Sequence, residues 1–201
     1  MELIWQSNYT SVGVNEICKK AGVTKGSFYH YFETKADLYY AAVLNHWEHI
    51  KVELDRVFDP ARPALEQLEA YLEMVLDHAR GKGLAEEGGK VVVGCPVFTS
   101  GGQCGCEEDK VQLAAQEMAA NKIAYETALI VRLKAEGRLD GDPDPAQTGR
   151  MLYQYIQGLL MYCRIYNDVS SVLSDLRPAV YRIVGLKAEY RQAAAEASSA
   201  A

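Results

Sequence analysis

The sequence predicts an all-α protein of about nine helices. Apolar residues recur three or four positions apart in successive stretches of the 201-residue chain, and glycine or proline separates these stretches. No alternating run of apolar and polar residues is long enough to indicate a strand. Near the N-terminus, residues 14–32 read as a helix, a tight turn and a very short second helix. Hydrophobic residues make up 49% of the chain, which is enough to bury a substantial core.

Residues 14–32 combine a helix end, a tight turn and a short helix. The apolar residues Val14, Ile17, Cys18 and Ala21 share one face, and Gly22 suits the left-handed turn that ends this helix. Thr24 can cap the next helix, whose first turn carries only small or basic residues. Such a start can approach phosphates and base edges closely, as in a DNA-binding helix-turn-helix. We expect the DNA contacts to come from Thr24, Lys25, Gly26, Ser27, Tyr29, His30 and, in the following helix, Lys35.

The run AGVTKGSFYHYF at residues 21–32, with Lys35 and Leu38 behind it, resembles the DNA-binding domain of the TetR-type (TetR/AcrR) one-component transcriptional regulators. The resemblance is strong over the first fifty residues, and the rest of the chain matches in its helix layout. It implies a dimeric repressor with a variable sensor body. The chain departs from the family at its start, where only residues 2–7 precede Asn8, so we expect a truncated first helix.

The remaining helices follow from apolar spacing and from the positions of glycine and proline. Thr34 and Asp37 form a capping-box-like start for a long helix that ends near residue 58. The glycine-rich stretch 93–106 is loop-like and too rich in glycine for a firm helix, and Pro178 is expected only near the first turn of its helix. Later helices are predicted over about residues 65–79, 108–136, 145–166 and 172–184.

We divide the chain into a helix-turn-helix domain (1–45), a helical ligand-binding and dimerisation domain (46–190) and a tail (191–201) expected to be disordered. The net charge is −6, but residues 1–35 carry +1 and the remainder carries −7. A nearly neutral head on an acidic body suits modest nonspecific affinity for DNA. No long apolar run indicates a membrane span and no signal peptide opens the sequence, so we expect a cytoplasmic protein.

The helix predicted over residues 145–166 is apolar on nearly every side. From Met151 to Tyr166, the clearly polar residues are Gln154, Gln157 and Arg164. Such a helix must be buried on more than one side, and the helix after it also has a broad apolar surface. A thick monomeric core is one explanation. We favour a homodimer in which the last two helices form a four-helix bundle with their copies, because two heads can then bind a palindrome.

The predicted body carries tyrosines, methionines and a histidine at positions typical of a core. Packing explains each of them alone, but together they are more polar than a core requires and indicate a ligand cavity. The family resemblance implies a cavity between the middle helices as well. We expect it to be lined by Tyr71, Met74, His78, Phe98, Met118, Tyr125, Tyr155 and Tyr162.

The five cysteines allow several interpretations. Cys18 and Cys163 fall on predicted buried faces, where they act as small apolar residues. Three interpretations remain open for Cys95, Cys104 and Cys106. They are ordinary thiols, ligands of a metal ion that would need a fourth ligand, or sensors of an oxidant or electrophile. The turn around Cys95 is similar to a Gly-Cys-Leu turn of TetR-type regulators that answer electrophiles, so Cys95 is the expected sensor thiol. We expect no metal and no cofactor.

Two classes of function compete at this point. One is a DNA-binding repressor, and the other is a cysteine-based enzyme or metal-binding helical dimer without DNA binding. A dimeric module that has lost DNA affinity is a further alternative. Of the four histidines, three fall in the head or on the long linking helix, so only His78 could pair with a nucleophilic cysteine. No phosphate-binding glycine loop or HExxH pair is present. We therefore expect a non-enzymatic repressor whose partners are double-stranded operator DNA, a small-molecule or electrophile effector and a second copy of the chain.

Overall fold

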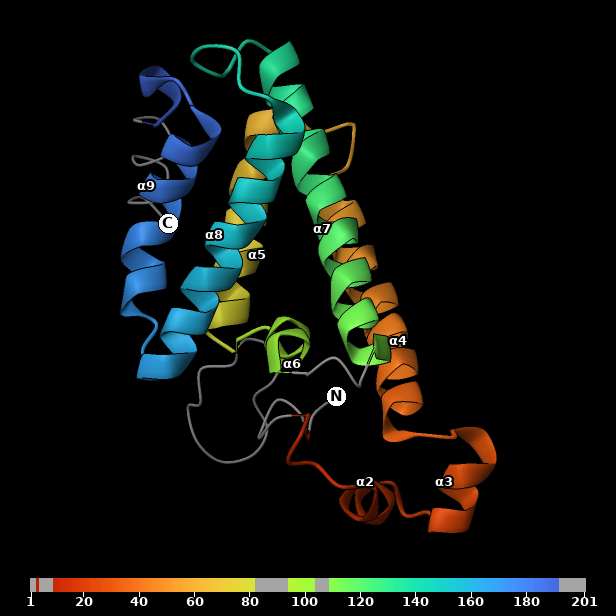
Figure 1. The fold of residues 1–201 in the computed structure, drawn as a ribbon. Coiled ribbons are helices and arrows are strands. Elements are labelled where there is room, and N and C mark those ends of the chain that lie inside the picture. The colour runs from red at the N-terminus through yellow and green to blue at the C-terminus, as the bar shows by residue number, and fades with distance from the viewer. Residues whose placement is uncertain (1–2, 4–8, 82–93, 104–108, 192–201) are drawn as a thin grey trace. The chain divides into compact units, whose positions relative to one another are not determined.

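The computed structural model describes residues 3, 9–81, 94–103 and 109–191. These residues form helices joined by turns, and among them one isolated antiparallel bridge pairs Leu139 with Leu186 (Figure 1). The all-α fold expected from the sequence is confirmed. The expectations for a truncated first helix, for Cys104 and Cys106, and for the tail from residue 192 lie outside the described residues.

The helix boundaries lie close to those that the sequence predicts. Asp144 shows the local cause for one of them: its carboxylate accepts a hydrogen bond from the backbone N–H of Gln147 at 2.6 Å, and Pro145 fills the first helical position. The described helices are α2 (Val14–Ala21), α3 (Lys25–Tyr31), α4 (Lys35–Val57), α5 (Ala64–Ala79), α6 (Pro96–Gln103), α7 (Asp109–Ala135), α8 (Pro145–Tyr166) and α9 (Ser170–Val184).

The chain forms two compact units. Unit 1 comprises Met1–Val52 and Gly94–Ala120, and unit 2 comprises Glu53–Val93 and Asn121–Ala201. The boundary falls inside α4 and α7, so each of these long helices contributes residues to both units. Helices α2 and α3 belong to unit 1, whereas α5, α8 and α9 belong to unit 2.

The core of unit 1 brings α4, α6 and α7 together. Gly101 of α6 lies so close to α7 that a Cβ built on it would be 2.4 Å from the Cβ of Ala115, so a side chain does not fit there. The sequence indicates a loop-like stretch too glycine-rich for a firm helix, whereas residues 96–103 form the regular helix α6, because packing against α7 outweighs the low helix propensity of glycine. The fully buried members of this core are Tyr9, Tyr39, Val43, Val97, Val111, Ala114 and Met118.

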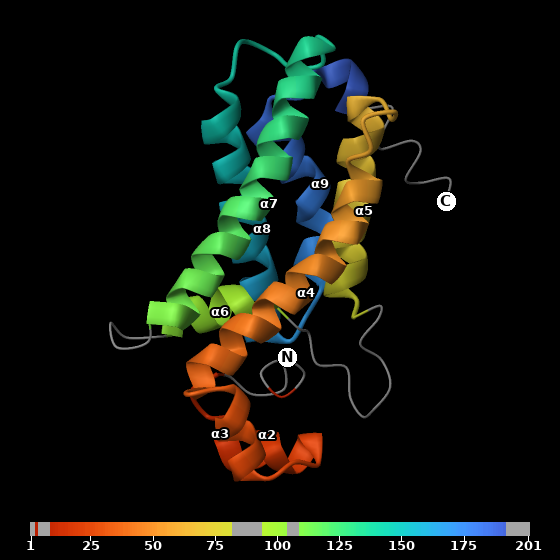
Figure 2. The ribbon, with the colours of Figure 1, turned by 90° about the vertical axis from the view of Figure 1, so that its right-hand side faces the viewer.

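In unit 2, α9 packs along α8 and also contacts α5 (Figures 1 and 2). Pro178 lies in the middle of α9, so the expectation that it occupies the first turn was wrong. Pro178 cannot donate to the carbonyl of Ser174, but both residues are exposed and solvent can hydrate that carbonyl. The opposite face of α9 is buried at regular intervals of four residues and holds the helix in place: Val172, Leu176, Val180 and Val184.

Candidate functional site

The turn between α2 and α3 is closed by backbone hydrogen bonds. Gly22 adopts a φ of 67°, in the left-handed region that glycine tolerates best. Its N–H donates to the carbonyl of Lys19 at 3.3 Å, and the N–H of Val23 donates to the carbonyl of Cys18 at 3.0 Å. These bonds end α2 and let α3 pack directly against it.

The first turn of α3 is exposed and has a defined local structure. Thr24 Oγ1 accepts a hydrogen bond from the backbone N–H of Ser27 at 3.1 Å, and the two hydroxyl oxygens are 3.0 Å apart. Thr24, Lys25, Gly26 and Ser27 are all exposed to solvent. The turn therefore presents two hydroxyls, a lysine and a glycine backbone together, as expected for an approach to DNA.

Three aromatic side chains follow on the outer face of the same helix. Phe28 is buried, and its ring packs edge-on against Tyr29 with centroids 5.1 Å apart. Tyr29 and Tyr31 are 55% and 77% exposed, and the ring of His30 contacts that of Tyr31. Large aromatic groups so exposed on a seven-residue helix indicate a surface that a partner covers.

Lys35 points toward the start of the chain. Its Nζ donates hydrogen bonds to the carbonyls of Tyr9 at 3.0 Å and Val12 at 3.2 Å, and it lies 4.2 Å from the centroid of the Tyr9 ring. This side chain thus joins α4 to the segment that precedes α2. Its direct contact with a DNA phosphate stays a prediction.

The expected capping box at the start of α4 is present. The backbone N–H of Thr34 donates to Asp37 Oδ2 at 2.9 Å, and the N–H of Asp37 donates to Thr34 Oγ1 at 3.1 Å. Asp37 also pairs with Lys110 of α7. Hydrogen bonds from Lys110 and Thr34 hold the pKa of Asp37 below its usual value. These contacts fix the helix that follows α3 within unit 1.

The apolar face of α2 borders a cavity of about 320 Å³ in unit 1. Cys18 is buried as expected, whereas Ile17 and Ala21 line the cavity and Ala21 is exposed. Lys20 and Lys35 lie at the same cavity, whose other lining residues are mainly apolar. The face that the sequence predicts is therefore only partly covered by the described residues.

A buried pair of polar residues lies in unit 2. The hydroxyl of Tyr71 on α5 donates a hydrogen bond to Glu126 Oε1 on α7 at 2.5 Å. Burial raises the pKa of Glu126 to about 8, although the Tyr71 hydrogen bond and the charge of Lys122 act in the opposite direction. Sequence reasoning missed Glu126. The available signal was its position on the apolar stripe of α7, four residues before the fully buried Ile130.

Aromatic and basic side chains surround this pair. The ring of Phe58 packs between those of Tyr71 and Tyr125, with centroids 5.2 and 5.4 Å apart. His78 lies two turns after Tyr71 on α5. Burial, with the charge of Lys122, lowers the pKa of His78 to about 4, so its imidazole is neutral at pH 7.

The other expected cavity residues are distributed more widely. Tyr155 donates from its hydroxyl to the carbonyl of Asp175 at 3.3 Å, and Tyr162 is 49% exposed. Neither has an interaction with Tyr71 or Glu126 among the described contacts. Phe98 and Met118 belong to unit 1, where Met118 is in the core and Phe98 is 40% exposed. Met74 is half-buried on α5, one turn after Tyr71.

Cys95 directly precedes α6 and is half-buried. Its carbonyl accepts hydrogen bonds from the N–H of Thr99 at 3.1 Å and from the Thr99 hydroxyl at 3.0 Å. Its side chain packs against the core of unit 1, which includes Tyr39 and Val43 of α4. A group attached to this thiol would therefore add bulk beside the core that α4 shares with α6 and α7.

The described part of the chain offers no group of three or more His, Cys, Asp and Glu side chains suited to a metal ion. Among the same residues, no helix is both long and apolar enough to cross a membrane.

The chain is similar to known transcriptional regulators in sequence and in structure. Residues 1–42 match the model of the bacterial regulatory proteins of the tetR family. The transcriptional regulator AcuR of Cereibacter sphaeroides is 29% identical over 166 residues, which are 82% of this chain and 73% of AcuR. A regulatory protein TetR from Rhodobacter sphaeroides has a similar crystal structure, with a TM-score of 0.75 and 25% identity over 92% of each chain. The reduced form of E. coli NemR superposes with a TM-score of 0.78 at 22% identity over 93% of each chain.

Proposed function

Because the chain belongs to the TetR/AcrR family of transcriptional regulators, we propose that it represses transcription by binding a palindromic operator as a homodimer and releasing it on an effector signal. The observation that carries this proposal is the exposed first turn of α3. The closed turn at Gly22 presents the hydroxyls of Thr24 and Ser27 beside Lys25. In a helix-turn-helix, the N-terminal residues of the recognition helix contact base edges in the major groove, and these residues can donate to bases and phosphates.

Each DNA contact has a proposed role. Lys25, His30 and Lys35 bind phosphates, and Tyr29 reaches both a phosphate and a base edge. The hydroxyls of Thr24 and Ser27 lie nearest to the bases. Gly26 lets the backbone approach the DNA, because it carries no side chain.

The proposed dimer interface is an exposed apolar surface on α8 and α9. Ile165 is 71% exposed and Tyr166 is 64% exposed, fractions that are costly for large apolar groups in water. Repetition of this surface about a two-fold axis would bury it in a four-helix bundle. Its other members are Met151, Tyr162 and Leu173.

Two effector mechanisms follow from the described side chains. A small molecule can bind in unit 2 beside Tyr71, His78 and Tyr125. Alternatively, an electrophile can modify Cys95 and press on the core of unit 1. In both cases the effector favours a dimer conformation that fits the operator poorly.

A gel-shift experiment with the DNA upstream of the protein's own gene tests the proposal. We expect a discrete complex that survives an excess of unrelated DNA, and one dimer per palindromic site. Binding no tighter than to unrelated DNA would contradict the proposal.

A further inference from the structure

Glu126 is a buried residue, and only one of its two carboxyl oxygens has a hydrogen-bond partner among the described residues. The residue is 1% exposed, and Tyr71 donates to its Oε1. Its Oε2 is buried and has no hydrogen-bond partner among the described residues, and none of the ion pairs between described residues includes Glu126. A buried acceptor without a donor is costly, and an unpaired buried charge is more so. When Glu126 is ionised, its Oε2 therefore lacks a donor, and a cationic donor would satisfy both the acceptor and the charge.

The titratable groups around Glu126 do not supply that donor. Lys122, one turn earlier on α7, acts on Glu126 through its charge but forms no ion pair with it among the described residues. His78 of α5 is neutral at pH 7 because its pKa is about 4. From α8, Tyr153 acts on Tyr71 rather than on the carboxylate itself.

A chain of aromatic rings leads away from the hydrogen bond between Tyr71 and Glu126. Phe58 contacts Tyr71, which bonds to Glu126, and also contacts Tyr125. Aromatic faces attract cations, and the attraction grows where water is excluded. Tyr125 and Met74 are only half-buried, whereas Tyr71 and Glu126 beneath them are buried. A ligand entering from the exposed side would therefore meet rings first and the carboxylate last.

We infer that the effector is a small organic cation, of the protonated amine class, whose N–H group donates to Glu126 Oε2 while its apolar part packs on Phe58 and Tyr125. This inference rests on the proposed function, because it names the ligand class of the proposed effector site.

The inferred pairing makes binding depend on pH. Glu126 has a pKa of about 8 in the empty protein, so below pH 8 an amine must displace a proton from it. Affinity for an amine that stays protonated should therefore be about 50-fold lower at pH 6 than at pH 8. A neutral ligand of the same shape should show no such dependence.

Calorimetric titration with three matched probes tests the inference: benzylamine, benzyl alcohol and benzoate. We expect benzylamine to bind the full-length protein at pH 8 at least about tenfold more tightly than either other probe. Glu126→Gln keeps the side-chain shape and removes the charge, so it should weaken benzylamine binding by about tenfold or more and abolish its pH dependence. Glu117→Gln is the matched control, because Glu117 accepts from the Tyr40 hydroxyl in unit 1 and should leave binding unchanged.

Four results would overturn the inference. They are no benzylamine binding at millimolar concentration, equal or tighter binding of benzyl alcohol, equal or tighter binding of benzoate, and unchanged benzylamine affinity in Glu126→Gln. A gel shift without any probe reports separately on the proposed function. Wild-type protein that binds operator but not benzylamine would contradict only the ligand class, whereas protein that binds benzylamine but no operator would contradict the proposed regulator.

Discussion

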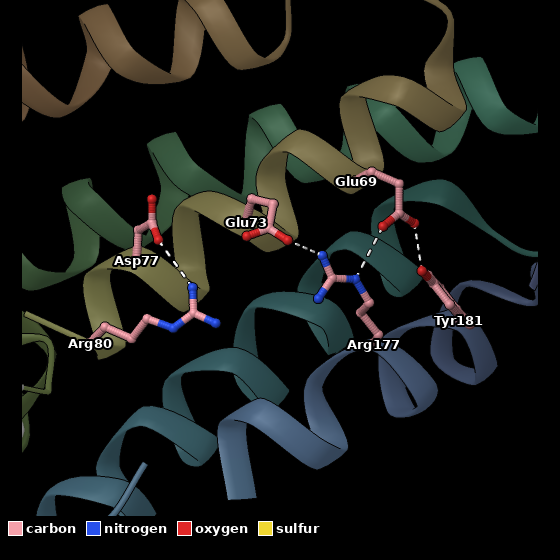
Figure 3. Close-up of polar contacts among 6 residues, drawn as sticks. All are labelled: Glu69, Glu73, Asp77, Arg80, Arg177 and Tyr181. Atoms are coloured by element: carbon pink, nitrogen blue, oxygen red, sulfur yellow. Dashed lines mark hydrogen bonds and ion pairs between the residues drawn. The ribbon is translucent and has the colours of Figure 1, made fainter. Parts of the chain in front are cut away.

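Nε of Arg177 on α9 donates a hydrogen bond to a carboxylate oxygen of Glu69 on α5 at 3.2 Å (Figure 3). The same guanidinium pairs with Glu73 one turn later, and the Tyr181 hydroxyl donates to the other oxygen of Glu69 at 2.6 Å. These contacts connect the helix that carries Tyr71 with a helix of the proposed dimer interface. They are a polar link through which the proposed effector site would influence the proposed dimer.

Arg177→Ala should lower the free energy of unfolding by about 1–2 kcal/mol, because it leaves Glu69 and Glu73 without their cation in a partly buried contact. Urea unfolding measures the change. Arg80→Ala is the control, since Arg80 and Asp77 form an exposed pair with both side chains 41% exposed. Its loss should cost less than about 0.5 kcal/mol. Equal effects of the two substitutions would show that the link does not stabilise the fold.

The pKa of Glu126 predicts a pH dependence of stability. A carboxyl whose pKa rises from an ordinary 4.5 to about 8 on folding binds more protons in the native state than in the unfolded state. Its stabilising contribution is therefore complete below pH 4.5 and is lost as the pH rises to 8.

The pKa of His78 falls from an ordinary 6.5 to about 4 on folding. Its contribution to the free energy of unfolding therefore rises with pH below pH 6.5, which offsets the loss from Glu126 in that range. Between pH 6.5 and 8 only the Glu126 slope remains. Over that interval, wild type should lose about 2 kcal/mol relative to Glu126→Gln, measured by urea unfolding at each pH. A pH-independent difference between the two proteins would contradict the raised pKa.

Ile165→Asp tests the proposed dimer interface. Ile165 is 71% exposed in the single chain, so the substitution should not disturb the chain's own packing. In a dimer the new carboxylate would be forced into an apolar seam, which should weaken association by about 100-fold or more. Val131→Asp, at a residue 50% exposed on α7, is the control. Sedimentation velocity that finds wild type monomeric at micromolar concentration would exclude the interface.

Cys95→Ser tests the thiol mechanism. Treatment of wild type with N-ethylmaleimide should release the operator, because the adduct presses on the core that contains Tyr39 and Val43. Cys95→Ser should stay bound after the same treatment, and Cys163→Ser should respond like wild type because Cys163 is fully buried. Equal release from wild type and Cys95→Ser would remove Cys95 from the mechanism.

Much of the fold could be predicted because its signals are local. Gly22 and Thr24 mark the turn before α3, and Asp144 with Pro145 marks the start of α8. Each of these residues acts on its own backbone within one helical turn. The reading of α6 as a loop failed because Gly101 is explained only by the approach of α7, which lies further along the chain.

In the candidate sites, too, only the features that depend on neighbouring residues in the sequence could be predicted. The exposed first turn of α3 follows from residues next to one another in sequence. Lys35 bonds to carbonyls more than twenty residues away, and the Tyr71 hydrogen bond to Glu126 spans 55 residues. Side-chain partners so distant depend on how helices pack, and apolar periodicity specifies which face packs but not which polar atoms meet there.

The most direct test measures operator affinity by fluorescence anisotropy, with labelled operator titrated at a series of salt concentrations. The proteins compared are wild type, Lys25→Ala, Tyr29→Ala and the unit 2 control Lys187→Ala. We expect Lys25→Ala to weaken binding to operator and unrelated DNA alike and to reduce the slope of log affinity against log salt by about 2, for one phosphate per protomer. Tyr29→Ala should lower operator affinity about tenfold more than affinity for unrelated DNA. Lys187→Ala should match wild type. Operator binding by Lys25→Ala and Tyr29→Ala as tight as that of wild type would contradict the assignment of α3 as the recognition helix.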